Sequence, residues 1–133
     1  MSEWVKNITE IWKSEQLRLS GPASPEVIRK AERTIGFTFP PELKELYLEV
    51  DGFSDDMNPN CFCIWPICTI VEQYVKSDDL EFVGFCDWLI NSHSIGFIKN
   101  KPGIYKEYDR SAPIADSFTG FLDLLLRDST VLY

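Results

Sequence analysis

The chain has 133 residues, of which 44% are apolar and 14% aromatic, and this composition excludes an intrinsically disordered protein. A chain of this length usually forms one domain, so we expect residues 1–133 to share a single hydrophobic core. The formal net charge of −8 argues against a nucleic-acid partner, because the phosphates would be repelled.

The first residues predict a surface helix and no export signal. Over residues 2–16, apolar side chains recur at the spacing of an amphipathic helix: Trp4, Val5, Ile8, Ile11 and Trp12. Charges appear early and no apolar signal region follows them, so we expect a cytoplasmic protein. The longest apolar run, residues 121–126, is far shorter than the roughly 20 residues that span a bilayer, and no membrane partner is expected.

Residues 24–53 predict a helical hairpin. Ser24 can cap a first helix, and Gly36 can end it because glycine adopts a positive φ without a steric clash. Pro40 and Pro41 then begin a second helix, which ends at the Asp-Gly pair of residues 51–52.

The middle of the chain predicts most of a sheet. Residues 61–67 form a continuous apolar run that is typical of a buried strand, with Cys61 and Cys63 on the same side. Thr69 and Glu72 form a capping box, which predicts a short helix over residues 70–76. Further strands are expected at residues 82–85, 88–91 and 95–98.

The last third predicts one more strand, over residues 104–108, and a closing helix to about residue 127 that Asp116 or Ser117 can cap. Gly120 weakens this helix by about 1 kcal/mol relative to Ala, which suggests a close packing contact. The order of elements predicts an α+β fold. In this fold, N-terminal helices and a C-terminal helix pack on a central, largely antiparallel, bent β-sheet.

Acidic residues are concentrated in one segment. Residues 51–92 carry a single Lys, so nearly all of the net charge belongs to this segment. Such a field attracts basic partners, although it can equally be a solvated surface that maintains solubility. The acidic residues of the segment are Asp51, Asp55, Asp56, Glu72, Asp78, Asp79, Glu81 and Asp87.

The sequence carries no strong pattern for catalysis. His93 is the only histidine, and its serine neighbours would point to the opposite side of a strand, so they form no dyad with it. Calcium-loop and Gly-rich phosphate-loop patterns are missing from the sequence. The cysteines are spaced wrongly for a zinc knuckle, which favours buried thiols: Cys61, Cys63, Cys68 and Cys86. We therefore expect no enzyme activity, no metal and no cofactor.

Trp65 and Trp88 have two interpretations. In a small sheet most tryptophans belong to the core. If either side chain is exposed beside the acidic segment, it would instead anchor an interface, as Trp often does. The neighbouring Asp87 and Trp88 are the most informative pair.

Ordered groups of residues carry a further signal. The first group lies in the hairpin and consists of Ile28, Ala31, Glu32, Ile35, Gly36, Phe39, Pro40, Leu43, Leu46, Asp51, Gly52 and Phe53. Three later groups follow in order: residues 65–66, 84–88 and 115–122. Over about residues 20–127, these groups together resemble the SUKH superfamily, which includes bacterial immunity proteins and fungal cell-wall-assembly regulators.

The resemblance implies the same fold and a non-enzymatic immunity protein. Such a protein would bind and neutralise the toxic domain of a bacterial polymorphic or contact-dependent toxin, often a basic nuclease or nucleic-acid-modifying enzyme. An acidic surface suits a basic partner. From charge alone, we expect the contact residues to be Asp55, Asp56, Asp78, Asp79, Glu81, Asp87 and Trp88. The alternatives are a regulatory interaction scaffold of the fungal type and a small metal-dependent hydrolase.

Overall fold

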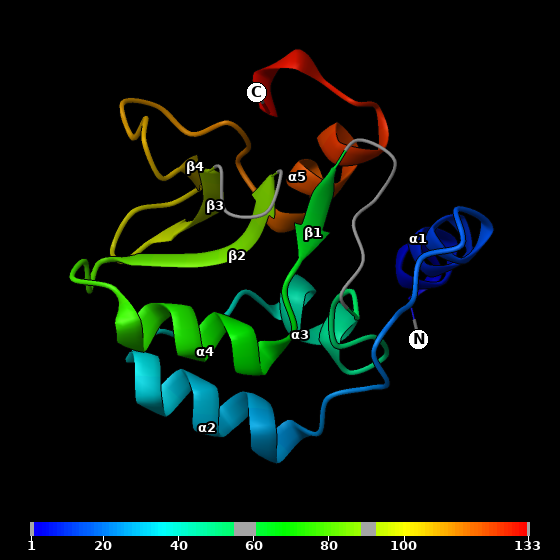
Figure 1. The fold of residues 1–133 in the computed structure, drawn as a ribbon, viewed down its shortest axis with the longest axis horizontal. Helices are drawn as coiled ribbons and strands as arrows, with labels where there is room; N and C mark the ends of the chain where they lie inside the picture. The colour runs from blue at the N-terminus through cyan, green and yellow to red at the C-terminus, as the bar shows by residue number, and fades with distance from the viewer. Residues whose placement is uncertain (1, 55–60, 89–92, 133) are drawn as a thin grey trace.

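A computed structural model describes residues 2–54, 61–88 and 93–132, and arranges them as helices around a sheet (Figure 1). The helices are α1 Glu3–Ser14, α2 Pro25–Ile35, α3 Pro41–Tyr47, α4 Ile67–Lys76 and α5 Phe118–Leu126, followed by a 3₁₀ turn at Thr130–Leu132. The strands β1 Phe62–Ile64, β2 Phe82–Trp88, β3 His93–Ile98 and β4 Tyr105–Lys106 pair antiparallel in that order. The expected α+β class is confirmed.

Helix ends that depend on local side chains lie where the sequence predicts them. The Ser24 hydroxyl accepts the Val27 N–H at 3.2 Å, and Gly36 ends α2 with φ of 74°. The Ser117 hydroxyl caps α5 by accepting the Gly120 N–H at 3.0 Å. A Cβ on Gly120 would lie 3.1 Å from that hydroxyl, so the close contact expected at this glycine is with the helix cap.

The predicted start of α4 is wrong by one turn. Thr69 lies inside the helix, which begins at Ile67 with Pro66 in the N-cap position. Pro66 offers no capping side chain, and the free N–H of Ile67 is bonded instead by Asp51, 16 residues earlier in the chain. The helix start is therefore set by a tertiary contact.

Several strand boundaries also differ from the prediction. β1 begins after Cys61, which has φ of 70°, so Cys61 and Cys63 do not alternate within one strand as expected. β2 continues to Trp88, and a bulge between Gly84 and Cys86 lets this strand bend. The strand expected at residues 88–91 lies mostly outside the described residues, and β4 is only two residues long.

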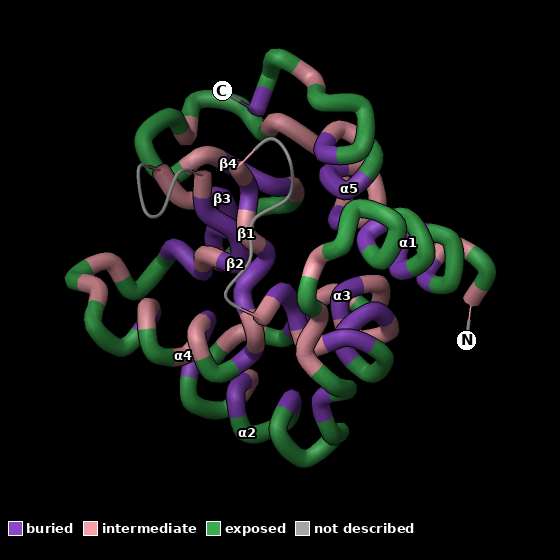
Figure 2. Tube along the Cα trace, turned by 45° about the vertical axis from the view of Figure 1, so that its right-hand side comes forward, coloured by how far each residue is buried: buried purple, intermediate pink, exposed green. Residues whose placement is uncertain are grey.

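The main core lies between the sheet and α5, and Phe82, Ile98 and Tyr105 form a second, smaller buried cluster. Phe85 on β2 packs against Phe97 on β3 and against Phe121 on α5, with ring centroids 5.0 and 5.2 Å apart. Figure 2 shows buried segments along the strands and the inner sides of the helices, with α2 and α4 side by side at one end of the sheet. The successive β2 residues Phe82 and Val83 are both buried, so both faces of this strand are largely covered.

Candidate partner-binding surface

Two side chains at the end of the helical hairpin hold the start of α4. The Asp51 carboxylate accepts the Ile67 N–H at 2.7 Å, and the Tyr47 hydroxyl donates to the Trp65 carbonyl at 2.6 Å. Burial raises the pKa of Asp51, although the hydrogen bond from Ile67 opposes it. Burial, and then the neighbouring Asp51, raise the pKa of Tyr47 well above its usual value. Asp51 therefore stabilises the start of α4 and is not part of an exposed acidic surface.

Glu32 has a comparable structural role inside the hairpin. Its carboxylate accepts the Phe39 N–H at 2.8 Å and pairs with the Lys44 ammonium at 3.2 Å. This fixes the extended piece between α2 and α3, where Phe39 is buried. The acidic residues of the hairpin motif are thus engaged in holding the scaffold.

Lys99, in the turn after β3, binds the C-terminal end of α2. Its ammonium donates to the Ile35 carbonyl at 2.6 Å and to the Tyr74 hydroxyl at 2.7 Å. Ile35 ends α2, so the positive charge meets the negative end of the helix dipole. Nothing local in the sequence signals this contact, because Ile35 lies 64 residues away.

Replacing Lys99 with Met is expected to lower the free energy of unfolding by about 1–3 kcal/mol, because two charge-assisted hydrogen bonds are lost. The measurement is chemical denaturation by urea. Lys101→Met is the matched control, since Lys101 is exposed in the same turn and should change stability by about 0.5 kcal/mol or less. Equal losses in the two variants would contradict a specific role for Lys99.

The residues between α4 and β2 form an acidic corner, defined here as residues 78–81. Asp78 and Glu81 are exposed, and so is Leu80, with 59% of its surface accessible. Val75, on the last turn of α4, is 63% exposed, and the Tyr74 hydroxyl donates to the Leu80 carbonyl at 2.8 Å. The corner therefore presents free carboxylates, with the exposed side chains of Leu80 and Val75 beside them, and such a surface can attract a basic partner.

Asp79 differs from its neighbours because its carboxylate already has partners within this protein. Its carboxylate accepts the Glu81 N–H at 3.0 Å and pairs with the Arg110 guanidinium at 2.6 Å. The Glu81 N–H, and then Arg110, hold the pKa of Asp79 below its usual value. Asp79 therefore fixes the shape of the corner and links it to the segment that follows β4.

Asp87 and Trp88 lie at the other end of β2. Asp87 is six positions after Glu81, which corresponds to roughly 20 Å along a strand. Asp87 is only 7% exposed and lies opposite Cys63 on β1 and Ser94 on β3. The structure brings Asp78, Asp79 and Glu81 together but leaves Asp87 apart from them, and Asp55 and Asp56 lie outside the described residues.

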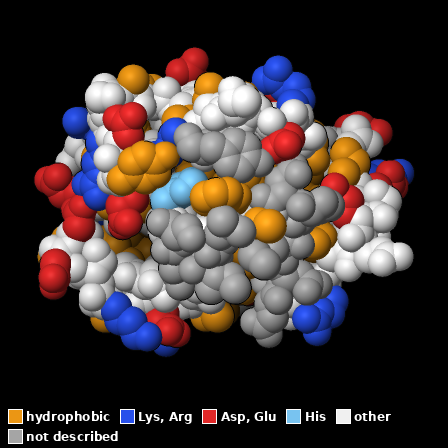
Figure 3. Space-filling view, turned by 45° about the horizontal axis from the view of Figure 1, so that its top comes forward, with side chains coloured by type: hydrophobic (Ala, Val, Ile, Leu, Met, Phe, Trp, Pro, Cys, Tyr) orange, Lys and Arg blue, Asp and Glu red, His pale blue; other side chains and the backbone are white. Residues whose placement is uncertain are grey.

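Trp88 belongs to an aromatic cluster with His93 and Tyr108. The His93 ring is 5.3 Å from each of the other two ring centroids, and its Nε2 lies 3.2 Å from the Leu132 carbonyl. Burial, and to a lesser extent Lys106, lower the pKa of His93, against the opposing effects of Leu132 and Asp87. Figure 3 shows this histidine among hydrophobic side chains. Trp65, in contrast, is 6% exposed and packs in the core.

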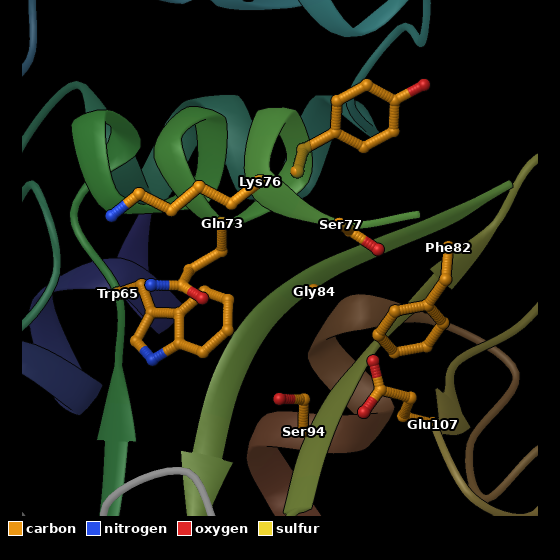
Figure 4. A pocket seen from close by; sticks show the side chains of 9 residues that line it. Trp65, Gln73, Lys76, Ser77, Phe82, Gly84, Ser94 and Glu107 are labelled. Atoms are coloured by element: carbon orange, nitrogen blue, oxygen red, sulfur yellow. The ribbon is translucent and has the colours of Figure 1, made fainter. Parts of the chain in front are cut away.

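A hollow of about 270 Å³ opens on the face of the sheet away from α5 (Figure 4). Its floor is Gly84, where a Cβ would meet the Trp65 ring at 3.1 Å. Sequence reasoning missed this feature because its lining comes from separate elements that only the fold assembles. The lining residues are Trp65, Gln73, Tyr74, Lys76, Ser77, Phe82, Gly84, Ser94 and Glu107.

Comparison with known proteins adds one positive result. The family model described as SMI1 / KNR4 family (SUKH-1) matches residues 22–124. No curated protein matches the chain. In the described ranges, each helix is too short or too polar to span a lipid bilayer, and no three His, Cys, Asp or Glu residues are grouped so that they could hold a metal ion.

Proposed function

We propose that this chain, which belongs to the SMI1 / KNR4 family (SUKH-1), is a non-enzymatic immunity protein. It would bind and neutralise the toxic domain of a bacterial polymorphic or contact-dependent toxin, with a basic nuclease or nucleic-acid-modifying domain as the partner. The observation that carries the proposal is the acidic corner, where Asp78, Leu80 and Glu81 are exposed side by side.

Electrostatics explains how such a corner would act. Opposite charges on two proteins speed their encounter and disfavour wrong partners, while apolar contacts slow dissociation. Asp78 and Glu81 make no side-chain ion pair with another described residue, so both carboxylates are available to a partner. Leu80 and Val75 supply apolar area beside them.

The direct test measures binding to the toxic domain of a polymorphic toxin encoded beside this gene, at low and high salt. We expect tight binding that weakens with salt and abolishes the toxic activity. The double variant Asp78→Lys with Glu81→Lys should weaken binding about tenfold or more at low salt.

The matched control is the double variant Glu10→Lys with Glu49→Lys, which makes the same change in net charge at exposed positions on α1 and after α3. It should alter affinity by about twofold or less if the corner is the contact surface. Equal weakening in both doubles would show that only net charge matters. A complete lack of binding would refute the immunity function.

A further inference from the structure

The hollow on the sheet face away from α5 has polar side chains that make no hydrogen bond or ion pair with another described residue. Among the described residues, the side chains of Gln73, Ser94 and Glu107 have no hydrogen-bond or ion-pair partner. The backbone N–H of Glu107 donates to the Ser94 carbonyl at 2.9 Å, which fixes Glu107 at the edge of the hollow. In Figure 4 its carboxylate points inward from beyond β4. The hollow therefore contains polar side chains whose hydrogen-bonding groups no other described residue uses.

Within the described ranges, the lining of the hollow carries one cation and one carboxylate. Lys76 is its one lining cation within the described ranges, and its ammonium is paired with Glu72 at 2.8 Å. Glu107 has no such counter-ion within the described part of the chain. A cationic group entering the hollow would therefore meet an uncompensated carboxylate.

The same sheet face already holds one guanidinium group in this way. Arg110 lies over the Phe82 ring, 4.9 Å from its centroid, and pairs with Asp79 at 2.6 Å. This combination of an aromatic face and a carboxylate is well suited to arginine. Phe82 and Glu107 both line the hollow, so an aromatic ring and a carboxylate are present there too.

The lining of the hollow extends across the strands of the sheet, a length that suits an extended chain. The lining runs from Trp65 beside β1, across Gly84 on β2 and Ser94 on β3, to Glu107 beyond β4. Three strand spacings correspond to about 14 Å, which four or five extended residues would cover. At Gly84 the Trp65 and Phe82 rings fill the space that a side chain would take, 3.1 and 3.4 Å from the position of a Cβ, so a segment in the hollow would lie against these rings.

We propose that this hollow binds an extended segment of a protein partner, with an arginine or lysine side chain directed to Glu107 and the segment's backbone lying against the Trp65 and Phe82 rings that cover Gly84. The inference deepens the proposed function, because the segment would belong to the same basic partner. It adds a second contact surface on the sheet face, separate from the acidic corner.

The test uses a short peptide and does not need the toxin. The probe is the acetylated and amidated pentapeptide Ala-Gly-Arg-Gly-Ala, titrated into the full chain while amide and indole N–H signals are followed by NMR. We expect saturable shifts of the Gly84 amide and the Trp65 indole. The same peptide with citrulline in place of arginine should bind at least about fivefold more weakly, because it has the same shape without the charge.

Variants locate the contact. Glu107→Gln should weaken binding of the arginine peptide at least about fivefold and leave the citrulline peptide unaffected. Glu10→Gln on α1 removes an exposed carboxylate far from the sheet in sequence and should have no effect. Equal binding of the two peptides, or shifts confined to residues 78–81, would overturn the inference.

The two proposals can fail separately. Peptide binding at Gly84 without any toxin binding would refute the immunity function and support the hollow as a basic-segment site. Toxin binding that is insensitive to Glu107→Gln, together with no peptide shifts at Gly84, would support the acidic corner and refute the hollow.

Discussion

Replacing Gly52 with Ala is expected to lower the free energy of unfolding by about 3 kcal/mol or more. Gly52 has φ of 73°, which costs a residue with a side chain roughly 1–2 kcal/mol. An added Cβ would also lie 2.6 Å from the Trp65 carbonyl carbon and 2.6 Å from the Pro66 nitrogen, and neither backbone atom can move without disturbing the start of α4. Urea denaturation followed by tryptophan fluorescence measures the loss.

Gly21→Ala is the matched control for Gly52. A Cβ at Gly21 has no atom within 4 Å, and this glycine does not have a positive φ. The substitution should change stability by about 0.5 kcal/mol or less. If the two variants were equally stable, the close approach of Gly52 to residues 65–66 would not explain why position 52 requires glycine.

Replacing Gly96 with Ala is expected to be comparably damaging, with a fall in Tm of roughly 10 °C or more. Gly96 on β3 pairs with Gly84 on β2, next to the bulge. A Cβ on Gly96 would overlap the Val83 carbonyl oxygen and lie 2.6 Å from the Gly84 Cα. Because these are backbone atoms of the central strand pair, the strands would have to separate. Differential scanning calorimetry measures the shift.

Gly84→Ala separates this backbone effect from simple loss of a glycine. At Gly84 an added Cβ would meet only side-chain atoms, the Trp65 ring at 3.1 and 3.3 Å and the Phe82 ring at 3.4 Å. The rings need to move by a few tenths of an ångström, so the expected cost is about 1 kcal/mol. A loss at Gly84 as large as that at Gly96 would contradict the explanation.

The helices could largely be predicted from the sequence because their signals are local. Ser24, Gly36 and Ser117 act on backbone groups a few residues away, and the structure confirms each of them. The start of α4 could not be predicted, since its first N–H is bonded by Asp51 from the end of the hairpin. A local capping pattern at Thr69 misled the prediction because the true partner is distant in the chain.

The candidate surface was less accessible to sequence reasoning. Counting acidic residues pointed to residues 78–81, among others, but it could not show that Asp79 is paired with Arg110 or that Asp87 is buried. Both facts depend on segments brought together by the sheet. The hollow has no local signal at all, because Trp65, Ser94 and Glu107 become neighbours only through strand pairing.

The contacts of Asp79 have a consequence for the thermodynamics of association. The carboxylate fixes the corner through Glu81 on one side and Arg110 on the other, so the backbone that presents Asp78 and Leu80 is already ordered in the unbound protein. A loop that is ordered in advance loses less conformational entropy when a partner binds. Binding at this corner should therefore carry a small ordering penalty, because the internal contacts of Asp79 have already fixed the backbone.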